Sequence, residues 1–99
     1  MARVELTPGV IDDFDRFLDH MARYDIADAP ARIVEIVQAI DVLTHSPLIG
    51  RPARGGKREL VIGHRSRGYA ALYRFMPNID TVFVLAIRSQ REAGYRRHR

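Results

Sequence analysis

The first half of the chain carries one short stretch with a period of two, followed by two stretches with a helical period. Residues 2–6 alternate apolar and polar, which predicts a strand with Val4 and Leu6 facing a core. Thr7 and Pro8 predict a helix start, with the hydroxyl as N-cap and the proline at the first helical position. The apolar residues that follow are spaced to form one helical stripe: Val10, Phe14, Phe17, Leu18 and Met21.

A second helix is predicted after the pattern breaks at residues 24–27. Asp28 precedes Ala29-Pro30 and is the expected cap of this helix. The helix is expected to end near Ser46-Pro47, and the few residues between the two helices predict a helical hairpin. The apolar stripe of the second helix consists of Ile33, Ile36, Val37, Ile40 and Leu43.

The second half of the chain changes to the period of strands. Residues 46–56 are rich in proline and glycine and are predicted to form a loop. The last apolar run, over residues 81–88, is apolar on both faces and should therefore be a central or well-covered strand. An antiparallel meander is expected from strands over residues 58–63, 68–75 and 81–88, joined by turns over 64–67 and 76–80.

The C-terminal segment begins with Ser89 and, three residues later, Glu92, which is the spacing of a capping box. This spacing predicts a short helical turn in which Arg91 and Tyr95 lie on one face. Arg88, the last residue of the preceding strand, should lie close to both.

The element order is therefore β-α-α-β-β-β with a short C-terminal helical turn. A length of 99 residues fits a single domain over residues 1–99. The expected fold class is α+β, with the helical hairpin packed on one face of a small sheet that contains the meander. The other face of the sheet would stay exposed, with the basic loop and the basic tail near its ends.

Composition excludes several classes of protein. The chain has no cysteine, which excludes disulfides and thiolate zinc sites. His20, His45 and His98 are scattered without metal-ligand spacing, and Gly55-Gly56-Lys57 lacks the spacing of a phosphate-binding loop. No apolar run reaches the length of a membrane span, and residues 1–5 carry no apolar signal stretch. We therefore expect a cytoplasmic protein with no membrane contact, no metal and no cofactor.

The charges divide sharply between the two halves. Residues 1–50 hold four arginines against nine acidic residues, a net charge of −5, whereas residues 51–99 hold twelve basic residues against three acidic ones, a net charge of +9. Fifteen of the sixteen basic residues are arginine, whose planar fork of donors binds phosphate or carboxylate in pairs. The C-terminal half is therefore expected to face a polyanion or an acidic partner.

Three patterns in this order resemble the RelE/ParE superfamily of toxins. They are residues 47–51 after the second helix, residues 58–62 leading into 68–73, and residues 84–95. The resemblance covers essentially the whole chain. It implies the toxin of a type II toxin–antitoxin pair, silenced by a cognate antitoxin whose C-terminal segment wraps over the helices and sheet of the toxin.

The superfamily has two main activities. RelE-like toxins cut mRNA on the ribosome without a metal, and ParE-like toxins, also called plasmid stabilisation proteins, inhibit DNA gyrase. For a nuclease, the resemblance implies Arg91, Tyr95 and Arg58 as catalytic residues. Ala70 stands where ribosome-dependent nucleases carry arginine, and Glu59 stands where a further base would be wanted. The ParE-like activity is therefore favoured, and the RelE-like endoribonuclease is the alternative.

RNA cleavage also needs a general base, and the sequence offers two weak candidates. Lys57 could serve if its pKa were lowered, and His64 lies in a predicted turn, but each is more simply interpreted as a solvated surface residue. A third interpretation is a non-toxic relative that binds only its antitoxin.

The candidate binding residues form two sets. We expect the antitoxin, an acidic and apolar peptide, to contact Phe14, Phe17, Leu18, Met21, Ile36 and Ile40 on the helices. We expect the target, either DNA gyrase or the ribosome and its mRNA, to contact one basic docking spot that includes Lys57, Arg58, Arg65, Arg74, Arg88, Arg91 and Tyr95.

Overall fold

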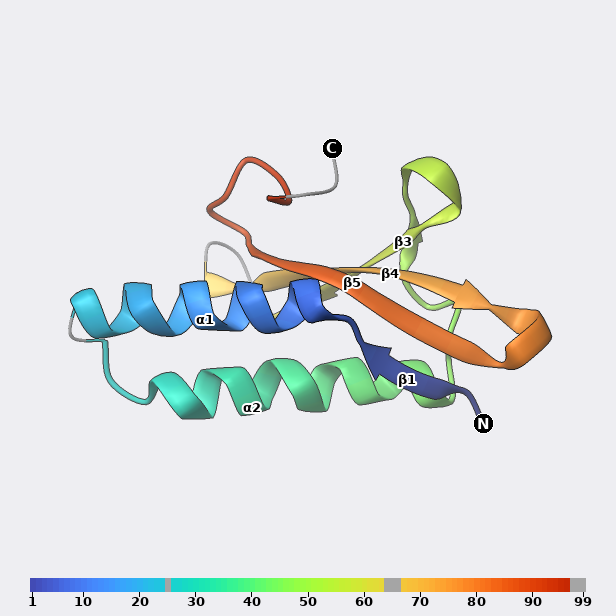
Figure 1. Cartoon of the computed structure of the whole chain (residues 1–99), viewed down its shortest axis with the longest axis horizontal. Helices are drawn as coiled ribbons and strands as arrows, with labels where there is room; N and C mark the ends of the chain where they lie inside the picture. The colour runs from blue at the N-terminus through green and yellow to red at the C-terminus, as the bar shows by residue number, and fades with distance from the viewer. Residues whose placement is uncertain (25, 64–66, 97–99) are drawn as a thin grey trace.

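In a computed structural model of the chain, two helices pack on one face of a five-stranded mixed sheet (Figure 1). The structure describes residues 1–24, 26–63 and 67–96. The expected α+β class and the order β-α-α-β-β-β are confirmed, with one additional short strand. The elements are β1 (Arg3–Leu6), α1 (Pro8–Arg23), α2 (Ala29–Ile40), β2 (Arg51–Pro52), β3 (Arg58–Ile62), β4 (Tyr69–Met76) and β5 (Thr81–Ser89).

The strands lie in the order β1-β5-β4-β3-β2. The predicted antiparallel meander β3-β4-β5 is confirmed, and β1 pairs with β5 in parallel. The strand β5 is well covered, as its apolar faces predicted, because most of its residues from Thr81 to Ile87 are buried. The two-residue strand β2 lies inside the segment predicted to be a loop, and it pairs antiparallel with the start of β3.

Both helix starts differ from the expected side-chain caps. Thr7 is the N-cap of α1, but its hydroxyl donates to the Val84 carbonyl oxygen at 2.8 Å and makes no cap hydrogen bond. The reason is that Thr7 alone joins β1 to α1, and the pairing of β1 with β5 holds it beside Val84. Asp28 is the N-cap of α2 in a left-handed conformation with φ of 61°, and it also makes no side-chain cap bond.

The end of α2 and the C-terminal segment are less helical than expected. The regular helix α2 ends at Ile40 and continues as a 3-10 turn, η1 (Asp41–Thr44). In the tail, the Glu92 N–H donates to the Ser89 carbonyl oxygen at 3.0 Å, but no helix follows within the residues described up to 96. The capping box does not form because the Glu92 carboxylate is bound to Arg16.

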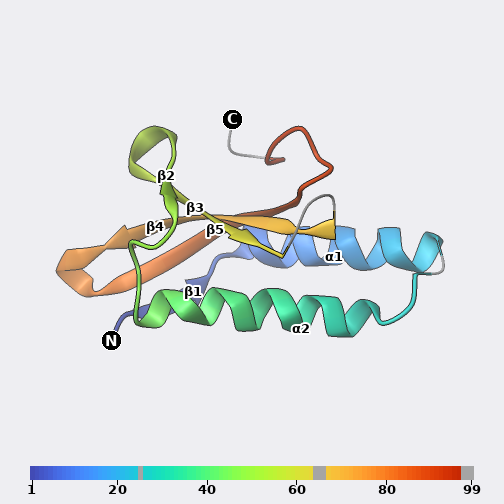
Figure 2. The same cartoon turned by 180° about the vertical axis from the view of Figure 1, so that it is seen from behind.

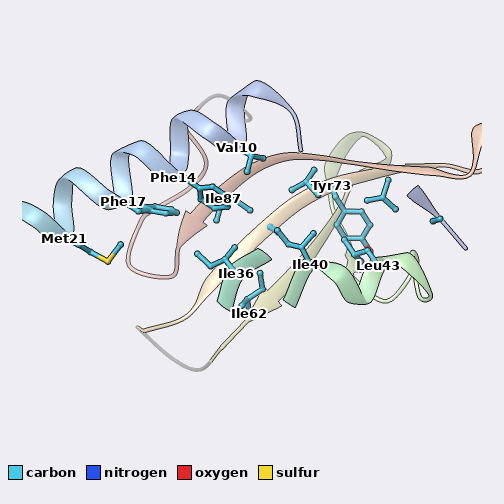
Figure 3. Packing of buried hydrophobic residues seen from close by; sticks show 14 residues of the cluster. Val10, Phe14, Phe17, Met21, Ile36, Ile40, Leu43, Ile62, Tyr73 and Ile87 are labelled. Atoms are coloured by element: carbon cyan, nitrogen blue, oxygen red, sulfur yellow. The ribbon is translucent and has the colours of Figure 1, made fainter. Parts of the chain in front are cut away.

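The core lies between the helical hairpin and the facing side of the sheet (Figure 3). The largest fully buried side chain is Tyr73 of β4, whose hydroxyl oxygen accepts a hydrogen bond from the Gly50 N–H at 2.9 Å. A Cβ at position 50 would lie 2.7 Å from the Tyr73 ring and 2.9 Å from the Glu59 carbonyl oxygen, so only glycine fits there. The core residues labelled in Figure 3 are Val10, Phe14, Phe17, Met21, Ile36, Ile40, Leu43, Ile62, Tyr73 and Ile87.

Helix α1 also completes one edge of the sheet. The strand β1 covers only residues 81–84 of β5, which would leave the second half of β5 without a neighbour on that side. Asp13 of α1 is almost fully buried there, and its carboxylate accepts the Ile87 N–H at 2.8 Å. The Arg16 guanidinium approaches the Ile87 carbonyl oxygen at 3.4 Å. An acceptor and a donor from one helix thus stand in for the backbone groups of an absent strand.

Candidate functional site

Four side chains meet on the face of the sheet that is turned away from the helices. We call Arg51, Glu59, Arg88 and Tyr95 the Glu59 cluster. The Tyr95 hydroxyl donates to Glu59 Oε2 at 2.5 Å, and Arg88 Nη2 lies 3.6 Å from the same oxygen. Arg51 donates to Glu59 Oε1 through Nε, at 2.9 Å, and through Nη2. The Arg88 guanidinium lies over the Tyr95 ring, 5.3 Å from its centroid.

Strand register brings these residues together. Arg51 of β2 is paired directly with Glu59 of β3. Residues paired across strands share a face of the sheet, so Glu59 shares a face with Leu72 and Ala86, and Val61 shares the same face with Ala70 and Arg88. The tail then crosses above this face, on the side opposite α2 (Figures 1 and 2). From there the Tyr95 hydroxyl reaches Glu59 of β3.

The pKa values of Tyr95 and Glu59 are shifted in opposite directions. Burial raises the pKa of Tyr95, and the hydrogen bond that its hydroxyl donates to Glu59 raises it further, against the opposing effect of Arg88. Burial alone would raise the pKa of Glu59, but the hydrogen bonds from Tyr95 and Arg51 and the charges of Arg51 and Arg88 together lower it. The phenol is therefore protonated and the carboxylate ionised near neutral pH.

Sequence reasoning identified half of this cluster. Arg88 and Tyr95 were expected near each other, and the structure brings them together. Glu59 was noted only as a misfit, and Arg51 was not singled out as a site residue. The short strand β2 places Arg51 opposite Glu59. This strand was not predicted because its sequence is rich in proline.

Arg58 and Arg91 lie away from this cluster. Arg58 is paired with Tyr73 and so points to the helix side of the sheet, where Nη1 donates to the carbonyl oxygens of Leu48 and Gly50 at 3.1 and 2.7 Å. Arg91 is exposed and does not share a helical face with Tyr95. The single docking spot expected for Arg58, Arg88 and Arg91 is therefore not assembled, because Arg58 has the opposite parity from Glu59 along β3.

Of the remaining basic candidates, Lys57 lies in the lining of a small hollow beside the Glu59 cluster. This hollow has a volume of about 160 Å³ and an apolar side formed by Pro52 and Leu72. Lys57 and Arg54 line it together with Glu59 and Tyr95. Arg74 donates to the Gly55 carbonyl oxygen at 2.8 Å, so it holds the loop after β2. Two further candidates, Arg65 and His64, lie outside the described residues.

A larger hollow opens near the C-terminal end of α1. It has a volume of about 610 Å³, and we call it the arginine-rimmed groove. Its apolar lining comes from Phe17, Met21, Ile26 and Tyr69. The arginines that line it are Arg16, Arg32, Arg67, Arg91 and Arg96.

Arg16 connects the groove to the tail. Its guanidinium donates to Asp13 Oδ1 at 3.1 Å and to Glu92 Oε1, and it lies 4.7 Å from the centroid of the Phe17 ring. The other Glu92 oxygen, Oε2, is buried without a hydrogen-bond partner in the part of the chain that the structure describes. The tail is thus attached at two points, through Glu92 to α1 and through Tyr95 to β3.

Most residues expected to contact an antitoxin lie in the core. Phe14, Phe17, Met21, Ile36 and Ile40 are all less than one tenth exposed, and Leu18 alone of the six is partly exposed. Phe17 and Met21 nevertheless line the arginine-rimmed groove. A peptide could therefore reach these two side chains through the groove and not along the helix surface.

Two kinds of feature are absent from the described residues. Among residues 1–24, 26–63 and 67–96, no group of three or more His, Cys, Asp or Glu side chains could hold a metal ion. No helix in the same part of the chain is both long and apolar enough to cross a membrane.

Solved structures share this fold over nearly the whole chain. A chain of the RelBE2 toxin–antitoxin complex from Mycobacterium tuberculosis aligns with a TM-score of 0.59 and 24% identity, covering 90% of this chain and 98% of that one. A chain of the intact E. coli RelBE complex gives 0.61 and 16%, covering 93% and 100%. A chain of the chromosomal ParDE system from P. aeruginosa gives 0.60 and 21%, covering 90% and 96%. The TM-scores of these three alignments show that the fold is shared.

The family follows from a sequence comparison. No curated protein sequence matches the chain. The model of the family described as the ParE toxin of the type II toxin–antitoxin system parDE matches residues 4–94. The chain therefore belongs to the ParE toxin family, within the RelE/ParE superfamily of type II toxin–antitoxin toxins.

Proposed function

We propose that this toxin stops growth by binding DNA gyrase, that it cleaves no RNA, and that a cognate antitoxin neutralises it. The observation that carries the proposal is the Glu59 cluster. The Glu59 carboxylate binds the hydroxyl of Tyr95, the phenol that the resemblance implies for a nuclease of this superfamily, and lies beside Arg88.

Metal-free RNA cleavage needs a base for the 2′-hydroxyl, an acid for the leaving oxygen, and cations free to stabilise the phosphorane. Here the Tyr95 hydroxyl donates its hydrogen bond to Glu59, and burial and Glu59 raise the pKa of Tyr95. Arg88 lies beside the Glu59 carboxylate, and Arg58 is bound to backbone carbonyls on the opposite face. Ala70, paired with Arg88, contributes no charge to this face. This arrangement supports a protein-binding toxin over an mRNA endoribonuclease.

The antitoxin is proposed to dock in the arginine-rimmed groove. Two of the solved relatives are complexes of a toxin with an antitoxin, which supports a partner of this kind. The groove combines an apolar lining with five arginines, so it fits a peptide that carries both apolar and acidic side chains. Phe17 and Met21 would form its apolar contact.

Two assays test the proposed target. Purified toxin should inhibit DNA supercoiling by gyrase, and RNA from cells in which the toxin is induced should show no new cuts within translated messages. Growth arrest with intact supercoiling and with cleaved messages would establish the endoribonuclease instead. Harmless induction would establish a non-toxic relative that binds only its antitoxin.

A charge reversal tests the proposed groove. Arg32→Glu changes a groove arginine on α2, and Arg3→Glu makes the same change at an exposed arginine of β1. Titration with the antitoxin encoded beside the toxin should show weaker binding for Arg32→Glu, and this difference should shrink as salt is added. Equal affinity of the two variants would place the antitoxin elsewhere.

A further inference from the structure

The Glu59 carboxylate occupies a position that is built for an anion. Both of its oxygens accept from charged or hydroxyl donors, with Tyr95 Oη and Arg88 Nη2 at Oε2 and two nitrogens of Arg51 at Oε1. The side chains of Glu59 and Arg88 are only 12% and 15% exposed. Arginine forks combined with a hydroxyl are also the donors with which proteins bind phosphate.

We propose that Glu59 is a specificity-determining residue that fills this anion site from within and thereby keeps nucleic acid phosphate off the sheet face. This inference rests on the proposed function, because it explains how a toxin with this basic face can select a protein target. Glu59 is held in place by β3, so its carboxylate is always present beside the donors. An external phosphate must therefore displace an attached anion and also approach a negative charge.

The charges around the cluster determine which partner remains possible. Lys57 and Arg54 line the neighbouring hollow, and no ionic partner is found for either among the described residues. These two cations can still attract carboxylates of an acidic protein, while Pro52 and Leu72 add apolar surface to the same hollow. A nucleic acid strand presents a phosphate at every nucleotide. It therefore cannot place phosphates beside the two cations of the hollow without also placing one near the Glu59 carboxylate. The face thus selects an acidic, partly apolar protein surface over a polynucleotide.

Removal of the Glu59 charge should convert the face into a nucleic acid binder. The probe is a short labelled single-stranded RNA, and its binding to purified toxin is followed by fluorescence anisotropy at low salt. Glu59→Gln should bind it at least about tenfold more tightly than the wild type, because a like charge about 4 Å from a phosphate repels it by that order. The gain should shrink with added salt.

A matched control separates the local effect from net charge. Glu5→Gln makes the same change in total charge on β1, where Glu5 pairs with Arg3 on the surface, and it should alter RNA affinity by no more than about twofold. Glu59→Asp keeps the charge while shortening the side chain, and it should show no gain. Adding Arg51→Ala to Glu59→Gln should cancel most of the gain, since it removes a donor from the vacated site.

Three results would overturn the inference: equal gains for Glu59→Gln and Glu5→Gln, a gain for Glu59→Asp, or a gain that survives the loss of Arg51. Circular dichroism of each variant verifies that it is folded. If the Glu59→Gln variant unfolds, the RNA affinity of Glu59→Asp is still compared with that of the wild type. These measurements use no gyrase, so their outcome is independent of the supercoiling assay that tests the proposed function.

Discussion

The hydroxyl of Tyr95 offers a direct measure of how firmly the tail is attached to the sheet. Tyr95→Phe removes the 2.5 Å hydrogen bond to Glu59 and keeps the aromatic ring under the Arg88 guanidinium. A hydrogen bond to a charged group contributes about 1.5–3 kcal/mol to stability. Since Glu59 keeps its bonds from Arg51 and Tyr95 is only partly buried, we expect the lower end, about 1.5 kcal/mol.

For a domain of this size, that loss corresponds to a fall in Tm of about 6–12 °C, which thermal unfolding followed by circular dichroism resolves. Tyr24→Phe is the matched control, because Tyr24 is 63% exposed. Because the pKa of Tyr95 is raised, the protonated phenol stabilises the fold fully below the unfolded pKa and loses this effect as pH rises through the folded pKa. The stability gap between wild type and Tyr95→Phe should therefore close in alkali. A Tm shift no larger than that of Tyr24→Phe would refute an attached tail.

Three further changes test the rest of the structure. The folded pKa of Glu59 is lowered, so its ionised form stabilises the fold above the unfolded pKa, and this stabilisation is lost as pH falls through the folded pKa. The urea midpoints of wild type and Glu59→Gln should therefore converge in acid. A gap between the midpoints that stays constant with pH would contradict this. Gly50→Ala should cost about 1–3 kcal/mol by overpacking, whereas Gly94→Ala, with no atom within 4 Å of the new Cβ, should cost far less in the same denaturation assay. Asp13→Ala leaves the buried Ile87 N–H without its acceptor and should cost about 1–3 kcal/mol; the exposed Asp12→Ala is its control, and equal effects would exclude a role for the edge contact.

The fold could be predicted because its main elements follow from periodicity. The helical stripes of Val10–Met21 and Ile33–Leu43 and the period-two runs of the meander each specify one buried face, so their order fixed the fold class. Where the prediction of a helix cap was wrong, a long-range contact had replaced the expected local hydrogen bond. Thr7 and Glu92 carry cap chemistry, but both bind distant partners, Val84 and Arg16.

The candidate site was less predictable because it depends on parity and on one unforeseen strand. Arg58 and Glu59 are adjacent in sequence, yet the pleat of β3 places them on opposite faces of the sheet. Which of them lies on which face depends on the register of β3 with β4. Arg51 lies in the cluster only because β2 pairs with β3, and no hydrophobic pattern in the sequence predicts this two-residue strand. Arg88 and Tyr95 were found because they are close in sequence as well as in space.

At Ile87, side chains of α1 take the place of a neighbouring strand, so exposure of this part of β5 depends on whether α1 is docked. The Ile87 amide is shielded from hydrogen exchange as long as α1 stays docked, since Asp13 is its acceptor. Undocking of α1 would uncover the backbone of β5 beyond Val84 and turn it into a template for pairing with another chain. The docked Asp13 carboxylate therefore keeps this part of β5 from presenting an open edge, a structural role separate from any contact with a target.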